Sequence, residues 1–323
     1  MIISVCISTF KRPQYLSILL KGINEQELPD NCKLKIIVVD NDPGGSSKSV
    51  VDEALSSFVH ELVYDIESRR GIPFSRNKAF SLANPNSEFV IFVDDDEYPE
   101  KDWIKQLLAM QQQTNADLVE GIVFPELNPN TPSWVIKGNF FLLPHYNALS
   151  NGQELPFDAV MTNNLLVKYE LLKKLDGPFN EEMGLIGCDD SALGINLHKI
   201  GCKMVFTNTA IVHEHIPEER TTFKWIMQRG YRTANTIWLL NPDKNFLGMI
   251  KLFVIGLLRV ILGIILLIPV YIISLFAGMR YFYKVIRIIV RGVGIMAGIM
   301  GFHYEEYNAS YTFNKATAAE ANA

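Results

Sequence analysis

Cysteine is scarce in this sequence, and the usual marks of secretion are missing. Four cysteines occur singly in 323 residues with no C-x-x-C spacing, so neither a zinc cluster nor a disulfide scaffold is indicated. Residues 1–5 lack the charged region of a signal peptide, and we therefore expect the body of the chain in the cytoplasm. Gly (21) and Pro (15) are near average usage and 48% of residues are hydrophobic, which excludes collagen and disorder.

Acidic residues are absent from one long stretch. No Asp or Glu occurs between Lys244 and Tyr304, where Lys and Arg contribute +7; subtracting this from the formal charge of −5 leaves −12 for the remainder. An acidic body of this kind disfavours nucleic-acid binding. The basic stretch instead suggests anionic lipid on the cytoplasmic side of a membrane.

The same stretch holds the longest apolar run of the chain. Residues 260–279 are 20 consecutive uncharged residues, which as a helix would extend about 30 Å and match a hydrocarbon core. Residues 286–301 are apolar but carry Arg287 and Arg291 four positions apart, as in an interfacial amphipathic helix or a second span. We predict membrane association here, with a buried core helix or an oligomer interface as the alternative.

Strand-like and helix-like segments alternate in the first hundred residues. The apolar runs predict strands at 2–7, 34–39, 61–66 and 88–93, and helical spacing predicts helices at 16–23, 46–58 and 74–82, the second capped by Ser46 and Ser47. This alternation predicts a mostly parallel sheet covered on both faces, with ligands beyond the carboxyl ends of its strands. Thr9, Asp40 and Asp94 to Asp96 follow three of these strands, so we expect them to converge on one crevice.

The second half of the chain is less regular. We expect a strand at 116–124, helices at 165–175 and 191–200, and a late strand at 203–212 that ends at His213-Glu214-His215. Residues 125–156 show no clear period and predict a substrate loop or lid. We therefore divide the chain into a catalytic domain (1–240), basic apolar membrane-associated helices (241–304) and a flexible tail (305–323).

Asp94, Asp95 and Asp96 place three carboxylates within one turn at a strand tip. Carboxylates this close raise one another's pKa unless a cation neutralises them. Mg²⁺ or Mn²⁺ suits such oxygen ligands, and Mg²⁺ is commonly held by one or two carboxylates plus substrate phosphates. A solvated acidic turn with a capping role is the alternative.

Five blocks of the sequence, taken in order, resemble the signature blocks of family 2 glycosyltransferases. The resemblance spans about residues 2–232. The blocks are Ser4–Arg12, Ile36–Asn41, Arg76–Ala79, Phe92–Glu97 and Gly187–Leu193.

The resemblance implies a GT-A fold, in which a Rossmann-like nucleotide-binding half joins an acceptor half, here followed by a C-terminal apolar helical membrane region. It also implies a nucleotide-sugar donor and Mg²⁺ or Mn²⁺ as cofactor. By this similarity Asp96 is the leading metal ligand, followed by Asp94 and His213. The residues implied at the donor are Thr9, Phe10, Arg12, Asp40, Asp42, Arg76, Asp94 and Asp95.

Inversion at an anomeric carbon needs a base that reaches the acceptor hydroxyl. The family commonly supplies it from a Glu-Asp pair that opens a helix, and Asp189-Asp190 occupies that place here, with Asp instead of Glu at 189. The resemblance therefore implies Asp190 as the base and Asp189 as the second choice. The alternative is that one of the two caps the helix.

Together these observations predict a membrane-associated, inverting glycosyltransferase on the cytoplasmic face of the cell membrane. It would move a hexose from a nucleotide-diphosphate sugar, with UDP-sugar as the expected donor, to a lipid-linked saccharide in cell-surface polysaccharide synthesis. The alternative is a catalytically silent membrane-associated scaffold that binds nucleotide or saccharide. No glycine lies between Ser8 and Pro13, which disfavours a nucleotidylyltransferase with a Gly-rich phosphate loop. The sequence does not predict the oligomeric state.

Overall fold

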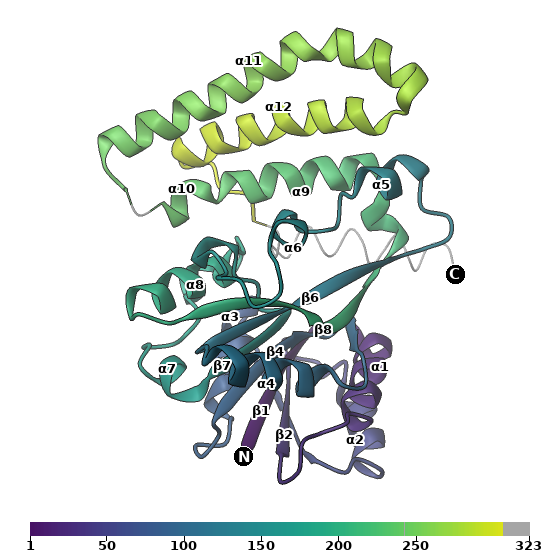
Figure 1. Ribbon diagram of the computed structural model, residues 1–323, viewed down its shortest axis with the longest axis vertical. Coiled ribbons are helices and arrows are strands. Elements are labelled where there is room, and N and C mark those ends of the chain that lie inside the picture. The colour runs from purple at the N-terminus through teal and green to yellow at the C-terminus, as the bar shows by residue number, and fades with distance from the viewer. Residues whose placement is uncertain (242, 306–323) are drawn as a thin grey trace. The chain divides into compact units, whose positions relative to one another are not determined.

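The computed structural model describes residues 1–241 and 243–305 (Figure 1). The chain divides into two compact units. The first contains Met1–Pro125 and Leu142–His215, and the second contains Glu126–Phe141 and the chain from Ile216 onward. The predicted tail, apart from Glu305, lies outside the described residues.

The alternation of strands and helices predicted for the first hundred residues is confirmed. Apolar runs give four buried or half-buried strands: β1 (Ile2–Thr9), β2 (Lys33–Asp40), β3 (Glu61–Ile66) and β4 (Phe89–Asp94). The connections carry three helices: α1 (Pro13–Asn24), α2 (Lys48–Leu55) and α3 (Ile72–Ser81). β1 pairs in parallel with both β2 and β4, and Thr9 stands opposite Asp40 while Ser8 stands opposite Asp94. The polar ends of the three strands therefore lie side by side.

The sheet has eight strands in the order β3-β2-β1-β4-β7-β6-β8-β5. The remaining strands are β5 (Glu97–Pro99), β6 (Leu118–Leu127), β7 (Asn164–Lys168) and β8 (Met204–Ile216). β7 pairs antiparallel with both β4 and β6, and β5 pairs antiparallel with β8. The sheet is thus mixed, and the parallel arrangement that we predicted holds for β3-β2-β1-β4.

Three local predictions were wrong. Residues 165–168 belong to β7, and the helix predicted there is confined to α7 (Tyr169–Lys173), because a short apolar run fits a buried strand as well as a helix. β8 continues through the His213-Glu214-His215 segment, because Glu214 and His213 pair with Glu97 and Tyr98 of β5. Ser47 precedes α2 but its side chain makes no capping bond.

The other elements of the first unit are short or lie between the strands. They are α4 (Trp103–Thr114), α6 (Pro144–Ala148), α8 (Asp189–Lys199) and the 3₁₀ helices η1 (Phe157–Ala159) and η2 (Glu181–Met183). The stretch 125–156, predicted as a loop or lid, also contains α5 (Ser133–Gly138) of the second unit.

The second unit is helical. It contains α5, η3 (Glu218–Thr221), α9 (Phe223–Asn235), α10 (Ile237–Leu240), α11 (Phe246–Ala277) and α12 (Arg280–Ile299). α12 packs against both α9 and α11, and Figure 1 shows these three helices as successive layers. The two predicted apolar helices are confirmed as α11 and α12. In the described part of the chain, α11 alone is long and apolar enough to cross a membrane.

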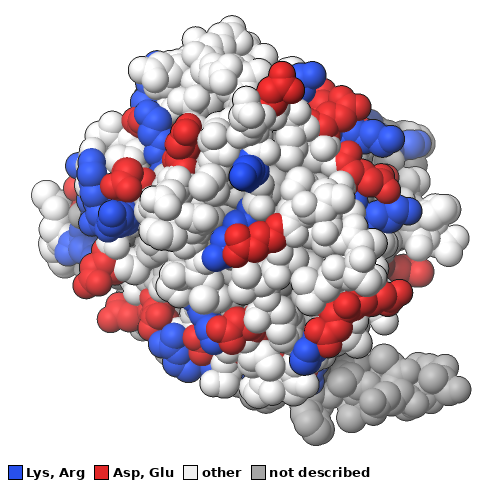
Figure 2. Space-filling view, turned by 90° about the horizontal axis from the view of Figure 1, so that it is seen from below, with Lys and Arg blue, Asp and Glu red and all other residues white. Residues whose placement is uncertain are grey.

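Acidic and basic side chains are mixed on one face of the molecule (Figure 2), whereas the α-helices of the second unit carry no acidic residue. On the face shown in Figure 2, acidic and basic side chains lie next to one another. The helices α5, α9, α11 and α12 carry basic residues but no Asp or Glu, and α10 has no charged residue. An anion that neutralises these helices must therefore come from outside them.

Asn164 joins several strands of the sheet from a fully buried position. Its Nδ2 donates to the carbonyl oxygens of Ile122 (3.0 Å) and Ala210 (2.9 Å), and its Oδ1 accepts from Trp103 Nε1 at 2.7 Å. Gly121 makes this packing possible, because a Cβ there would overlap Asn164 Nδ2 and lie 2.5 Å from the Ala210 carbonyl oxygen.

We therefore expect Gly121→Ala to lower the free energy of unfolding by about 3 kcal/mol, because it overpacks the sheet and displaces a satisfied buried amide. Gly44→Ala is the matched control, since a Cβ at Gly44 meets nothing closer than 3.5 Å. Urea unfolding followed by fluorescence measures both variants. Equal stability of the two would contradict this account of the Asn164 site.

Candidate active site

Arg76 is a buried arginine that contacts three carboxylates. α3 positions its side chain, which is 7% exposed. Nη1 contacts Asp189 Oδ2 at 2.7 Å and Asp190 Oδ1 at 2.6 Å, while Nη2 contacts Asp94 Oδ1 at 3.0 Å. Arg76 thus joins the end of β4 to the start of α8. Charge-assisted bonds of this length are the stronger class of hydrogen bond.

A second arginine neutralises the rest of the acidic turn. Arg12 Nη1 contacts Asp95 Oδ1 at 3.1 Å and Asp96 Oδ2 at 2.8 Å, and Thr9 Oγ1 donates to Asp95 Oδ2 at 2.7 Å. Asp95 and Asp96 are buried, so the alternative of a solvated turn is wrong. Burial raises the pKa of Asp95 to about 7, against the opposing charge of Arg12. The two guanidinium groups thus offset part of the negative charge of the acidic turn.

Asp189 and Asp190 open α8 as its first two residues. Cys188 precedes them with φ of 72°, so neither aspartate occupies the capping position that we considered as their alternative role. Asp190 Oδ1 accepts from Arg76 and from the Thr162 hydroxyl. Burial and the neighbouring Asp189 raise the pKa of Asp190 above its usual range, while Arg76 opposes this shift. Asp190 therefore keeps its proton at a higher pH than an ordinary aspartate does.

Asp40 is fully buried at the end of β2. Its carboxylate accepts from the backbone N–H of Asp42 (3.0 Å) and of Ser47 (2.8 Å), and from the Tyr64 hydroxyl (3.1 Å). These bonds hold the segment between β2 and α2 in place. Ser47 contributes its N–H to this arrangement, and its hydroxyl lies 3.3 Å from Thr9 Oγ1.

Two further predicted site residues, Phe10 and His213, make other contacts. Phe10 follows β1, and the guanidinium carbon of Arg70 lies 5.3 Å from its ring centroid. His213 stands in β8, where its ring stacks on Tyr98 (centroids 5.0 Å apart) and its Nε2 lies 2.9 Å from Glu100 Oε1. The structure thus places His213 beside Glu100. The neighbouring His215 donates its backbone N–H to the Asp96 carbonyl oxygen at 2.9 Å.

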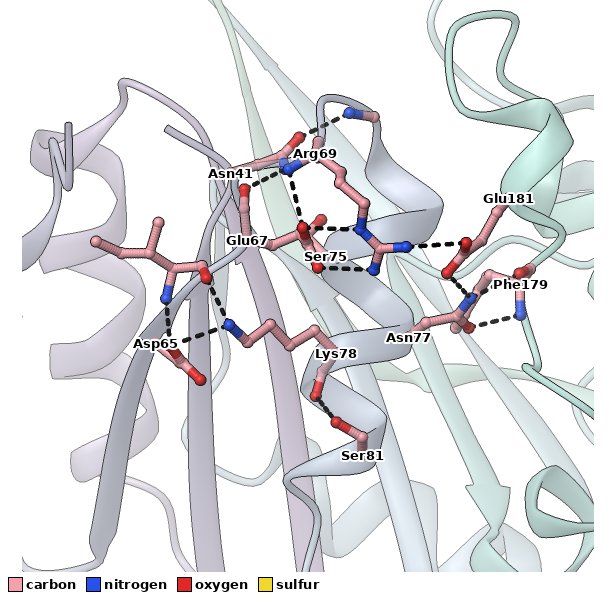
Figure 3. Close-up of polar contacts among 12 residues, drawn as sticks. Asn41, Asp65, Glu67, Arg69, Ser75, Asn77, Lys78, Ser81, Phe179 and Glu181 are labelled. Carbon is pink, nitrogen blue, oxygen red and sulfur yellow. Dashed lines mark hydrogen bonds and ion pairs between the residues drawn. The ribbon is translucent and has the colours of Figure 1, made fainter. Parts of the chain in front are cut away.

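A polar network that sequence reasoning missed holds the segment leading into α8 (Figure 3). Arg69 contacts Glu67 Oε2 at 2.9 Å and Glu181 Oε2 at 3.1 Å. Asn77 of α3 donates to the Phe179 carbonyl oxygen (2.8 Å) and accepts from its N–H (3.0 Å). The Phe179 ring also lies 5.6 Å from the Arg76 guanidinium carbon. No local pattern reveals the contacts of Arg69 with Glu181 and of Asn77 with Phe179, because their members are about a hundred residues apart.

The acidic turn fits a divalent cation by the chemistry of its donors. Carboxylate oxygens are the ligands that Mg²⁺ and Mn²⁺ prefer, and the Asp94 side chain is 40% exposed. Within residues 1–241 and 243–305, no three His, Cys, Asp or Glu side chains form a complete protein cage for a metal. A cation here would therefore depend on one or two carboxylates together with phosphate oxygens of a bound ligand.

The family model for glycosyl transferase family 2 matches residues 4–169, just over half of the chain. The chain belongs to glycosyltransferase family 2. The matched range includes both arginines and the acidic turn, and it ends before Asp189. Membership thus confirms the family that the five sequence blocks resemble.

Curated relatives of this family 2 glycosyltransferase include ExoM and TarS. The succinoglycan biosynthesis protein ExoM of Rhizobium meliloti (strain 1021) is 27% identical over 242 residues, which are 75% of this chain and 76% of ExoM. The poly(ribitol-phosphate) beta-N-acetylglucosaminyltransferase TarS of Staphylococcus aureus (strain Mu50 / ATCC 700699) is 25% identical over 116 residues, which are 36% of this chain and 20% of TarS.

Solved structures show the same fold at low sequence identity. S. aureus TarS 1-349 in complex with UDP has a TM-score of 0.53 and 14% identity, over 96% of this chain and 97% of that one. The mannosyltransferase PcManGT of Pyrobaculum calidifontis, in complex with GDP-Man and Mn²⁺, has a TM-score of 0.57 and 16% identity, over 98% of this chain and 80% of PcManGT. The longer TarS structure is covered over 43% of its length. These similarities confirm the predicted GT-A fold.

Proposed function

We propose that this glycosyltransferase inverts the anomeric centre as it moves a hexose from a UDP-sugar to a lipid-linked saccharide in exopolysaccharide synthesis. The observation that carries the proposal is the Arg76 cluster, because it fixes Asp190 beside the acidic turn that ends β4. The name of ExoM supports succinoglycan-type biosynthesis as the setting. The TarS complexes with UDP and UDP-GlcNAc support a uridine donor.

The donor would bind at the carboxyl ends of β1, β2 and β4. We assign the nucleoside to Thr9, Phe10, Asp40 and Asp42, and the diphosphate to the side with Arg12 and Arg76. Asp94 and Asp95 would face the ribose and the phosphates. Each of these side chains follows one of the parallel strands or packs against the acidic turn, and ligands of open α/β sheets bind at this edge.

Asp96 and Asp94 would hold the Mg²⁺ or Mn²⁺ ion together with phosphate oxygens of the donor. His213, predicted as a further ligand, is not retained, because it contacts Glu100 and no three described His, Cys, Asp or Glu side chains form a metal site. When bound, the ion supplies positive charge to the diphosphate as the glycosidic bond breaks. The PcManGT complex with Mn²⁺ supports this cofactor class. Arg12 and Arg76 add fixed positive charge on the same side, which stabilises negative charge that develops on the leaving group.

Asp190 would act as the general base. Its carboxylate takes the proton of the acceptor hydroxyl while that oxygen attacks the anomeric carbon. The bond from this carbon to the diphosphate breaks, and the nucleoside diphosphate leaves with the electron pair. Arg76 and Thr162 fix the carboxylate, and the raised pKa of Asp190 suits a base that must hold a proton. Asp189 is the second candidate for this role.

The C-terminal helices would bring the enzyme to its acceptor. α11 is largely exposed and apolar, with Leu247, Ile268 and Phe276 exposed by 70% or more. We therefore assign residues 1–240 to catalysis and 241–304 to association with the cytoplasmic face of the membrane, where a lipid-linked acceptor would be concentrated.

Thermal unfolding with UDP, GDP, CDP and dTDP, each with Mn²⁺ or EDTA, tests the donor assignment. We expect UDP with Mn²⁺ to stabilise the protein by about 3 kcal/mol at a hundredfold excess over its dissociation constant, and EDTA to remove most of this effect. Asp96→Asn should lose the Mn²⁺-dependent part. If no diphosphate stabilises the folded protein, the donor assignment is wrong and the scaffold alternative gains support.

A further inference from the structure

Four arginines of the second unit lie close together on three packed helices. Arg229 belongs to α9, Arg259 to α11, and Arg287 and Arg291 to α12. The Arg287 stem packs on α9, because a Cβ at Gly230 would lie 3.2 Å from its Cγ. We call these four residues the arginine cluster.

Contacts with uncharged groups contribute to holding Arg229, Arg287 and Arg291 in place. Arg291 Nη1 donates to Thr233 Oγ1 at 3.0 Å. The guanidinium carbon of Arg287 lies 5.8 Å from the Phe140 ring centroid, and that of Arg229 lies 5.4 Å from the Trp225 ring centroid. These aromatic faces orient guanidinium groups but supply no negative charge that could neutralise them.

Three of the four guanidinium groups, those of Arg259, Arg287 and Arg291, lack a neutralising carboxylate among the described residues. Arg287 Nε is inaccessible to solvent and has no hydrogen-bond partner. Within residues 1–241 and 243–305, no ion pair involves Arg259, Arg287 or Arg291. The helices that carry the cluster contain no Asp or Glu, so their own residues cannot supply the missing charge.

The positive charges of the four arginines repel one another. Burial, together with the positive charges of Arg291 and Arg229, lowers the pKa of Arg287 to about 10. Burial and the charge of Arg259 lower the pKa of Arg291. Guanidinium groups that repel one another in a partly desolvated place destabilise the fold unless an anion joins them.

We propose that the arginine cluster binds the phosphate group of an anionic lipid. Guanidinium groups offer paired N–H donors that match phosphate oxygens. The cluster lies beside α11, whose apolar side chains are broadly exposed, and lipid phosphates occupy the boundary between such an apolar face and water. This proposal rests on the proposed function only in requiring a membrane. It requires neither donor binding nor sugar transfer.

Sedimentation with vesicles tests the proposal in full-length protein. Phosphatidylcholine vesicles are compared with vesicles that also contain about 20% phosphatidic acid, in about 0.5 M NaCl so that long-range attraction is largely screened. We expect wild type to keep a preference of about tenfold for phosphatidic acid, since direct charge-assisted hydrogen bonds persist when long-range attraction is screened. The double variant Arg287→Gln/Arg291→Gln should lose this preference.

Lys251→Gln/Lys284→Gln is the matched control, because it removes the same charge from exposed positions on α11 and α12. This variant should keep most of the preference at high salt. If both double variants lost the preference for phosphatidic acid equally, the preference would depend only on overall positive charge, and the proposal would be overturned. Preference retained in Arg287→Gln/Arg291→Gln would also overturn it.

Two further measurements separate failure of the proposal from other causes. Without anionic lipid, Arg287→Gln/Arg291→Gln should unfold at the same or a higher temperature than wild type, because it relieves repulsion. Its stabilisation by UDP and Mn²⁺ should match wild type, which shows that the first unit is folded and tests the donor site separately. If inorganic phosphate binds the cluster but lipid vesicles show no preference, the assignment to lipid is wrong.

Discussion

Arg76→Gln is expected to lower the free energy of unfolding by about 3–5 kcal/mol and to abolish sugar transfer. The substitution removes the positive charge that three carboxylates share, and two of these, Asp189 and Asp190, have side chains that are 4% and 21% exposed. Breaking a buried ion pair by removing one partner is strongly destabilising because it leaves the other charge uncompensated. Urea unfolding and a transfer assay measure the two effects.

Arg69→Gln is the control for this prediction. Arg69 also contacts two carboxylates, those of Glu67 and Glu181, but its side chain is 55% exposed. Solvent screens exposed pairs, so this variant should lose much less stability than Arg76→Gln. Arg76→Lys keeps the positive charge without the planar guanidinium group. Its loss of stability should lie between those of Arg69→Gln and Arg76→Gln. Similar losses for Arg69→Gln and Arg76→Gln would contradict the central position given to Arg76.

Asp190→Asn is expected to lower kcat by about 10²–10⁴-fold while leaving UDP binding close to wild type, because the amide keeps the shape of the side chain but cannot accept a proton. Initial rates of UDP release measure kcat, and thermal stabilisation by UDP with Mn²⁺ measures binding. If kcat is unchanged, another residue is the base, and Asp189→Asn becomes the decisive variant.

The pH dependence of kcat provides a second test of Asp190. Activity that needs the ionised carboxylate should fall as the pH drops below the pKa of Asp190, which lies above the ordinary aspartate range. Asp189 contributes to this upward shift, so Asp189→Asn should lower the pKa of Asp190 and move the acid limb of the profile to lower pH. A limb that stays in place would show that Asp190 does not control it.

The strand-end part of the site was predictable from the sequence because it depends on local pattern. Thr9, Asp40 and Asp94 each follow a run of apolar residues, and parallel pairing then brings them into register. The same alternation and the five blocks were sufficient to predict the GT-A fold. The positions of β5 to β8 were less predictable, because short apolar runs such as 165–168 carry no period that separates strand from helix.

The connections across the site were not predictable in this way. Arg76 joins residues that lie 18, 113 and 114 positions away, and only the tertiary fold decides which carboxylates it reaches. The same is true of Asn164, a polar residue in an apolar strand whose partners lie on three other elements. The sequence also pointed to His213 without revealing its partner. Pairing of β8 with β5 brings His213 beside Glu100, a residue that we did not predict in the site.

The most direct test of the account follows labelled sugar from a panel of UDP-hexoses into lipid extracted from membranes, and determines the anomeric configuration of the product. We predict that label enters the lipid fraction with inverted configuration in the presence of Mn²⁺ or Mg²⁺, and that Asp190→Asn reduces this incorporation at least about a hundredfold. A product with retained configuration, or undiminished transfer by Asp190→Asn, would contradict it.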